Sequence, residues 1–172
     1  MNVFTQEPRH FIQCLIGPRQ VGKTTLADQV VEAVGCPYHY VSADLATLQN
    51  ISWLQQQWDV ARELTKAHGK GLLVIDEIQK IPHWSDMVKS LWDRDTASKT
   101  NLIVLLLGSS PWLMQKGLTE SLAGRFEIIP ITHWSFKEMQ EMFGWTLERY
   151  LYFGGYPGAA FLADEKNPSR WI

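Results

Sequence analysis

Residues 11–26 read FIQCLIGPRQVGKTTL, an apolar run followed by a loop bounded by glycines and the start of an amphipathic stretch. The loop, Gly17 to Thr24, matches G-x-x-x-x-G-K-S/T at every fixed position. Glycines let successive backbone N–H groups point inward at phosphate oxygens, and the helix that follows adds its positive N-terminal end. In such a loop Lys23 reaches the terminal phosphates and Thr24 offers its hydroxyl to magnesium. The sequence therefore predicts a phosphate-binding loop between a strand and a helix.

The loop and the residue after it form the predicted nucleotide contact set. Successive backbone N–H groups of the turn are expected to point at the phosphates. Arg19 has two possible roles, because it could contact phosphate or lie against the last part of the chain. The predicted contacts are Gly17, Pro18, Arg19, Gln20, Val21, Gly22, Lys23, Thr24 and Thr25.

Short apolar runs alternate with amphipathic stretches along the chain, which is typical of strand–helix units on a parallel sheet. The pattern predicts an α/β fold, a three-layer sandwich around a five-stranded parallel sheet. The run at 102–107 is the most apolar and is expected near the centre of the sheet. Two helices have capping-box spacing at their starts, Ser52 with Gln55 and Ser135 with Glu138. The predicted strands are 11–16, 38–41, 72–75, 102–107 and 126–131.

Two carboxylates end the third predicted strand. Leu72 to Ile75 is a continuous apolar run, and Asp76 and Glu77 follow it directly. We expect this strand to neighbour the strand before the loop, since ligands bind at the carboxyl ends of strands in open α/β sheets. Asp76 would then hold magnesium, and Glu77 would orient or deprotonate the water that attacks the terminal phosphate. The alternative for Glu77 is a solvated charge or an ion pair with Lys80.

Three further polar residues lie at strand ends. Ser109 follows the 102–107 strand, where it could sense the terminal phosphate or the attacking water; its alternative role is to cap the helix near Pro111. Arg125 precedes the fifth strand and could neutralise transition-state charge at its own site or at a neighbouring subunit's, or form a structural ion pair. Asp44, after the second strand, is a candidate for the outer magnesium shell and otherwise a turn former.

Five segments of the sequence resemble bacterial and archaeal AAA-type ATPases that carry a C-terminal domain of unknown function. The resemblance covers about residues 11–161 and implies an ATP-binding core with strand order 5-1-4-3-2. It also implies a Walker A motif at the loop, a Walker B motif at Asp76 and Glu77, and a sensor at the turn after the fourth strand. Arg125 would belong to the family's Gly-Arg signature, and a role as an arginine finger is an expectation. The five segments are Gly17–Thr25, Val74–Pro82, Gly108–Ser110, Leu122–Phe126 and Gly154–Pro157.

The composition narrows the class of protein. The 172 residues are 45% apolar and 20% charged with a formal net charge of -2, which is enough for one core. The 16 Lys and Arg are spread almost evenly, so this segment has no nucleic-acid or membrane footprint. The longest aliphatic run is far short of a membrane span and no apolar signal segment is present, so we expect a cytoplasmic location. Cys14 and Cys36 are expected to be free packing residues, and the scattered His residues suggest no metal other than magnesium.

The chain is expected to divide after residue 144. Residues 1–144 would form the ATPase core and residues 145–172 the start of a C-terminal domain, because a glycine- and proline-rich turn occupies 154–158. Asn167 and Pro168 are good first residues of a helix that ends after one turn. We therefore expect a truncated C-terminal helical segment, with the rest of that domain missing from this chain.

Six of the eight Trp residues fall into two groups. Trp58, Trp84 and Trp92 lie on the apolar faces of predicted helices, so we expect them in the core. The periodicity of the sequence places neither Trp134 nor Trp145, and it does not place Trp112.

The motifs together predict magnesium-dependent hydrolysis of ATP, with the nucleotide state moving an attached C-terminal domain. The alternative is a nucleotide-dependent binding or switch module with little turnover. A P-loop kinase is disfavoured because Glu77 adjoins Asp76 as a water activator and no cluster of lid Arg residues is visible. A GTPase is disfavoured because the chain has no Asn-Lys-x-Asp motif. The expected partners are ATP or ADP, the missing C-terminal domain and, if Arg125 acts in trans, further copies of this chain.

Overall fold

The computed structural model describes residues 9–44 and 50–162. The one-turn helix predicted from Asn167 lies outside the described residues. Strands and helices alternate through most of the described part. The elements are β1 (Ile12–Ile16), α2 (Lys23–Val34), β2 (Tyr38–Ser42), α3 (Ile51–His68), β3 (Gly71–Asp76), η1 (Ile78–Lys80), α4 (Trp84–Ala97), β4 (Leu102–Gly108), α5 (Pro111–Ser121), β5 (Phe126–Pro130), α6 (Phe136–Phe143), α7 (Leu147–Phe153) and η2 (Pro157–Leu162).

The five strands form one parallel sheet in the order β2-β3-β4-β1-β5. This confirms the predicted α/β class and the order 5-1-4-3-2. The central place of β4 is also confirmed. The prediction that the 72–75 strand neighbours the 11–16 strand is wrong, because β4 lies between β3 and β1. All seven residues of β4 are buried, and a strand this apolar is stable only where neighbours cover it on every side.

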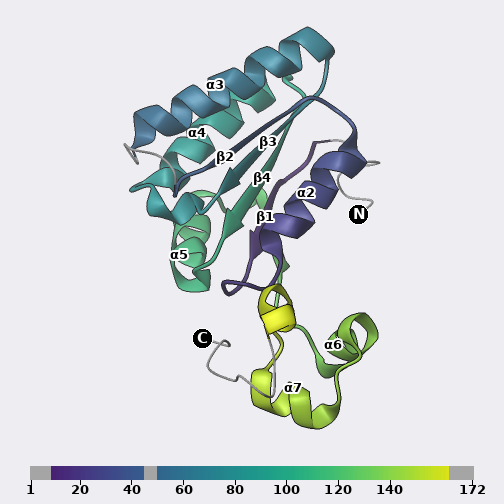
Figure 1. Cartoon of the computed structure of the whole chain (residues 1–172). Coiled ribbons are helices and arrows are strands. Elements are labelled where there is room, and N and C mark those ends of the chain that lie inside the picture. The colour runs from purple at the N-terminus through teal and green to yellow at the C-terminus, as the bar shows by residue number, and fades with distance from the viewer. Residues whose placement is uncertain (1–8, 45–49, 163–172) are drawn as a thin grey trace.

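Helices cover both faces of the sheet, as Figure 1 shows, with α3, α4 and α5 on one side and α2 on the other. Successive side chains of a strand point to opposite faces, so β1 contributes Ile12, Cys14 and Ile16 to the α3–α5 side and Leu15 to the α2 side. The α3–α5 side also holds three helix residues that were predicted in the core. These are Trp58, Trp84 and Trp92, and all of them are buried.

The ends of two helices test the predicted caps. The 51–68 helix begins one residue before Ser52, and its cap is Asn50, whose side chain accepts a hydrogen bond from the Trp53 N–H at 2.8 Å. The predicted cap at Ser52 is therefore wrong. Asn50 is the residue directly before the first helical residue, and Asn is at least as good an N-cap as Ser. The capping box of Ser135 with Glu138 is confirmed.

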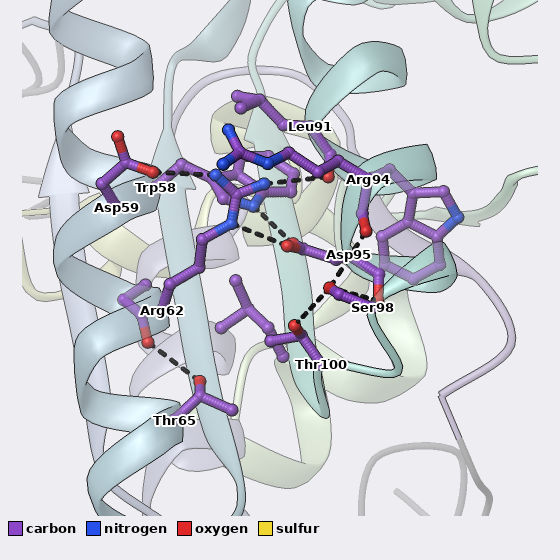
Figure 2. A network of polar contacts seen from close by, with 12 residues as sticks. Trp58, Asp59, Arg62, Thr65, Leu91, Arg94, Asp95, Ser98 and Thr100 are labelled. Atoms are coloured by element: carbon purple, nitrogen blue, oxygen red, sulfur yellow. Dashed lines mark hydrogen bonds and ion pairs between the residues drawn. The ribbon is translucent and has the colours of Figure 1, made fainter.

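A buried polar cluster joins α3 to α4 (Figure 2). Arg62 on α3 is 8% exposed and Asp95 on α4 is 1% exposed. Arg62 Nε donates to Asp95 Oδ1 at 2.6 Å, and Trp58 Nε1 donates to Asp95 Oδ2 at 2.7 Å. The two remaining guanidinium nitrogens donate to Asp59 Oδ1 at 2.7 Å and to the Leu91 carbonyl at 3.1 Å. Every nitrogen of this guanidinium and both oxygens of this carboxylate thus have a partner, and we call Trp58, Arg62 and Asp95 the α3–α4 cluster.

The α6–α7 segment lies beyond the carboxyl ends of the strands, apart from the main sandwich (Figure 1). It has a small core of its own, made of Met139, Trp145, Phe153 and Ala160. Met139 belongs to α6, so α6 packs with α7. The division of the chain after residue 144 stays a prediction. Within the described ranges, no helix combines the length and the apolar character that crossing a membrane requires.

Candidate functional site

The loop between β1 and α2 lies at the carboxyl edge of the sheet. Two of its residues adopt left-handed backbone conformations, Gln20 at φ 65° and Gly22 at φ 95°. Such turns direct consecutive N–H groups into one concavity, which is the basis of anion binding by these loops. At Gly17 a side chain has no room, since a Cβ would lie 1.9 Å from the carbonyl oxygen of Ile131. The local backbone therefore has the form that the motif predicts.

Lys23 is the first residue of α2 and its side chain bends back over the loop. Its Nζ donates to the carbonyl oxygens of Gly17 at 2.9 Å and of Pro18 at 2.6 Å. Burial lowers the pKa of Lys23, while the negative charges of Glu77 and Asp76 act in the opposite direction. The loop carbonyls thus hold the Lys23 ammonium group close to the negative charges of Asp76 and Glu77.

Asp76, at the end of β3, lies beside Thr24 of α2. The Thr24 hydroxyl donates to Asp76 Oδ2 at 3.4 Å, and the Glu77 N–H donates to Asp76 Oδ1 at 2.8 Å. Burial and the neighbouring charge of Glu77 raise the pKa of Asp76. A hydroxyl next to a carboxylate in a partly buried, negatively charged position is a donor set that suits Mg²⁺. The residues present therefore fit the predicted metal.

Glu77 has a left-handed backbone, φ 54°, and its carboxylate meets two side-chain donors. Ser109 Oγ donates to Glu77 Oε2 at 2.7 Å, and Gln79 Nε2 donates to the same oxygen at 2.5 Å. Lys80, the alternative partner for Glu77, forms an ion pair with Asp44 instead. The structure thus brings Ser109 to Glu77, whereas the cap of α5 is the next residue along the chain.

A cavity of about 480 Å³ opens between the loop and the two acids. This volume lies within the usual range for small-molecule sites. Asp44 also lines it, and its backbone N–H donates to the Ser42 hydroxyl at 3.2 Å, as in a turn. The lining residues are Arg19, Gln20, Gly22, Lys23, Thr24, Thr25, Asp44, Asp76, Glu77 and Gly158.

Three predicted contacts of the loop do not line this cavity. Gly17 and Pro18 line a second, mainly apolar cavity of about 410 Å³ that also reaches β5 and α5. Val21 is buried under the loop, where it is 2% exposed. Gly17 and Val21 can still contribute backbone N–H groups to the site, whereas Pro18, which has no N–H, can contribute only packing or its carbonyl.

Arg125 lies at the other edge of the sheet. Its carbonyl accepts from the Ile12 N–H, at the start of β1, whereas the loop follows the end of that strand. Its guanidinium donates to both carboxylate oxygens of Asp93 on α4, at 2.7 and 3.0 Å. These hydrogen bonds raise the pKa of Arg125. An action of Arg125 on the phosphate of its own chain does not fit this geometry, because a residue that precedes a parallel strand lies at the edge opposite the loop.

The structure adds three residues to the site that the motifs did not single out. Gln79 contacts Glu77, Gly158 lines the cavity, and Trp134 Nε1 donates to the Val21 carbonyl at 3.2 Å. A signal for Gly158 exists in the sequence, in the glycine-rich turn at 154–158. Trp134 had none, because it lies in a connection that has no periodicity.

The sheet order, the loop and the two acids at one edge define the class of this protein: it is a nucleotide-binding P-loop domain. A family model described as an AAA domain matches residues 9–140, which is most of the chain. The chain therefore belongs to the AAA-type P-loop ATPase family. A comparison with curated proteins finds no match.

Proposed function

We propose that this domain binds ATP with magnesium, hydrolyses it, and couples hydrolysis to movement of an attached C-terminal domain. The observation that carries the proposal is the convergence of Lys23, Thr24, Asp76 and Glu77 on one cavity. These side chains come from two separate segments of the chain and supply a cation, a hydroxyl and two acids. This combination suits phosphoryl transfer, since positioning and charge stabilisation account for most of its catalysis.

Each residue has a distinct role in this proposal. The loop N–H groups and Lys23 bind the phosphates, with the ammonium group exchanging its carbonyl partners for phosphate oxygens. Thr24 and Asp76 would hold magnesium, which neutralises charge on the phosphate oxygens when bound. Glu77 orients the attacking water and accepts its proton. Ser109 holds the Glu77 carboxylate.

A second candidate function is a nucleotide-dependent switch with little turnover. The contacts between the loop and the chain after β5 favour it, because Trp134 bonds to the Val21 carbonyl and Gly158 lines the cavity. A nucleotide that rearranges the loop would change these contacts whether or not it is hydrolysed. The two functions differ in phosphate release and share nucleotide binding.

Two substitutions separate the candidates. Lys23→Ala removes charge-assisted hydrogen bonds worth about 1.5–3 kcal/mol, so we expect affinity for ATP to fall by about 10- to 100-fold. Glu77→Gln removes the base and should lower phosphate release by about 100-fold or more while ATP stays bound. The measurements are calorimetric binding and phosphate release under saturating magnesium and ATP. Glu63→Gln, at an exposed position on α3, is the matched control and should change neither.

The outcomes decide between the two functions. Equal phosphate release from the wild type and Glu77→Gln would exclude the enzymatic function and leave the switch. Unchanged ATP affinity in Lys23→Ala would exclude both.

We also propose that Arg125 acts on the site of a neighbouring copy. Its position at the edge opposite its own loop supports action in trans, and the exposed Asp93 partner can release it. Arg125→Ala and Lys23→Ala should each be inactive alone, and mixing them should restore part of the activity, since one supplies the intact site and the other the guanidinium. Asp93→Ala keeps the guanidinium and is expected to stay active. Absence of complementation, together with a rate per molecule that does not depend on concentration, would overturn this proposal.

A further inference from the structure

Among the residues that the structure describes, the side chains that hold the Glu77 carboxylate contact one of its two oxygens. Ser109 Oγ and Gln79 Nε2 both donate to Oε2, and Gln79 Nε2 also lies 3.4 Å from Ser109 Oγ. None of the described residues donates a hydrogen bond to Oε1. Because Glu77 lines the cavity, the carboxylate has one oxygen fixed by the protein and one that can meet a ligand.

Gln79 is an unfavourable choice of residue for stability alone. Its amide nitrogen must face the two oxygens, since a carboxylate can only accept hydrogen bonds. Its carbonyl oxygen Oε1 is then buried without a hydrogen-bond partner among the described residues. Leaving such a group unpaired is a real cost, so a buried orphan in a site calls for a functional reason.

The backbone makes a second unfavourable choice at the same place. Glu77 adopts φ 54°, a left-handed conformation that glycine tolerates and other residues resist. This turn starts η1 and brings Gln79, two residues later, back beside the Glu77 carboxylate. Ile78 between them is fully buried and anchors the turn in the core. Strain and an orphan acceptor two residues apart are typical of functional sites.

We infer that Gln79 is a positioning residue for hydrolysis: it fixes Glu77 Oε2 so that Oε1 takes the proton of the attacking water. This inference rests on the proposed ATP hydrolysis. As the water oxygen bonds to the terminal phosphorus, its proton passes to Oε1. The bond from that phosphorus to the bridging oxygen breaks, and the electron pair leaves with ADP. Gln79 touches neither the water nor the nucleotide and acts only through the carboxylate.

The test separates rate from binding. Gln79→Leu keeps a side chain of similar volume and removes the donor, so kcat should fall by about 10- to 100-fold, the usual effect of a misplaced catalytic group. Calorimetric binding of ADP and the KM for ATP should stay within about twofold of the wild type. Gln79→Asn keeps the amide on a shorter side chain and should restore part of kcat. Should the Leu variant fail to fold, Gln79→Met serves the same purpose.

A double substitution shows whether Gln79 acts through Glu77. When Glu77 is already Gln, the further change Gln79→Leu should cost little in a single-turnover rate, because residues that act as one unit are not additive. The matched control is Gln13→Leu. Gln13 is also a buried Gln whose Oε1 has no hydrogen-bond partner within residues 9–44 and 50–162, but it lies within β1, and kcat should be unchanged.

The results that overturn the inference are distinct from those that overturn hydrolysis. A wild-type rate in Gln79→Leu, with Glu77→Gln inactive, refutes the role of Gln79 and leaves the enzyme intact. Weaker ADP binding in step with the lower rate, or multiplicative effects in the double variant, also refutes it. Equal phosphate release from the wild type and Glu77→Gln refutes the proposed enzyme, and the role of Gln79 falls with it.

Discussion

The two polar clusters of this protein, the α3–α4 cluster and the one around Glu77, are built in opposite ways. In the α3–α4 cluster every nitrogen of the Arg62 guanidinium and both oxygens of Asp95 are paired (Figure 2). Around Glu77 both donors converge on one oxygen, Gln79 Oε1 has no partner among the described residues, and the backbone is left-handed.

This difference indicates that the α3–α4 cluster stabilises the fold, whereas the groups around Glu77 belong to a functional site. Buried charges are tolerated when every hydrogen-bonding group is satisfied, and such a network fixes one arrangement of α3 against α4. A site that must bind a ligand leaves some hydrogen-bonding groups without a protein partner and tolerates backbone strain. The comparison makes four predictions about stability and titration.

The largest effect is expected at Asp95. Asp95→Ala leaves Arg62 buried with its charge uncompensated and Trp58 Nε1 without an acceptor, so the free energy of unfolding should fall by about 3–5 kcal/mol. Urea unfolding of the wild type and of Asp95→Ala measures this loss of free energy. The control, Asp59→Ala, removes the half-exposed partner of Arg62 and should cost less than about 1 kcal/mol. Similar losses in the two variants would contradict the distinction between the buried and the exposed partner.

A smaller effect is expected at the Glu77 backbone. Glu77→Gly and Glu77→Ala lose the same carboxylate, so their difference reports the left-handed conformation. We expect the Gly variant to be more stable than the Ala variant by about 1 kcal/mol in urea unfolding. At the exposed helical position Ala67, Ala67→Gly should be destabilising by about 0.5–1 kcal/mol. A more stable Glu77→Ala would show that no strain resides at this turn.

Gln79 should matter little for stability. Gln79→Leu loses hydrogen bonds to Glu77 and Ser109 but also removes a buried carbonyl that has no partner in the described part of the chain, so the free energy of unfolding should change by less than about 1 kcal/mol. Urea unfolding of the same preparations used for the kinetics gives this value. A loss as large as that of Asp95→Ala would place Gln79 with the structural cluster.

The smallest effect concerns an exposed pair. The hydrogen bonds from Arg125 lower the pKa of Asp93 below its ordinary value of 3.8. Any stability from the pair is therefore present above pH 3.8 and is lost as the pH falls through the depressed pKa. NMR titration of the Asp93 carboxyl should give a midpoint below 3.8 that moves up in Arg125→Ala. An unchanged midpoint would show that the pair does not form in solution.

The sequence predicted most of the fold and part of the site, for identifiable reasons. The loop motif and the apolar runs are local patterns, so the five strands and their helices could be read directly. The place of β4 between β3 and β1 contradicted the expected adjacency of 72–75 with 11–16, because buried strands have no periodicity that identifies their neighbours. The contact of Gln79 depends on the left-handed turn at Glu77, which no local pattern indicates.

The hydrogen bond from Trp134 to the Val21 carbonyl couples the phosphate-binding loop to the α6–α7 segment. A trans peptide carries its carbonyl and its N–H on opposite sides, so an indole that holds the Val21 carbonyl directs the Gly22 N–H away from Trp134. Gly22 lines the cavity, and Trp134 leads into α6. In the proposed site, phosphate bound at the Gly22 N–H and Trp134 bound at the Val21 carbonyl would therefore act on the same peptide group. Suppose that a partner binds and displaces Trp134, and that this changes the affinity for phosphate by some factor. Thermodynamic reciprocity then requires that phosphate change the affinity for that partner by the same factor.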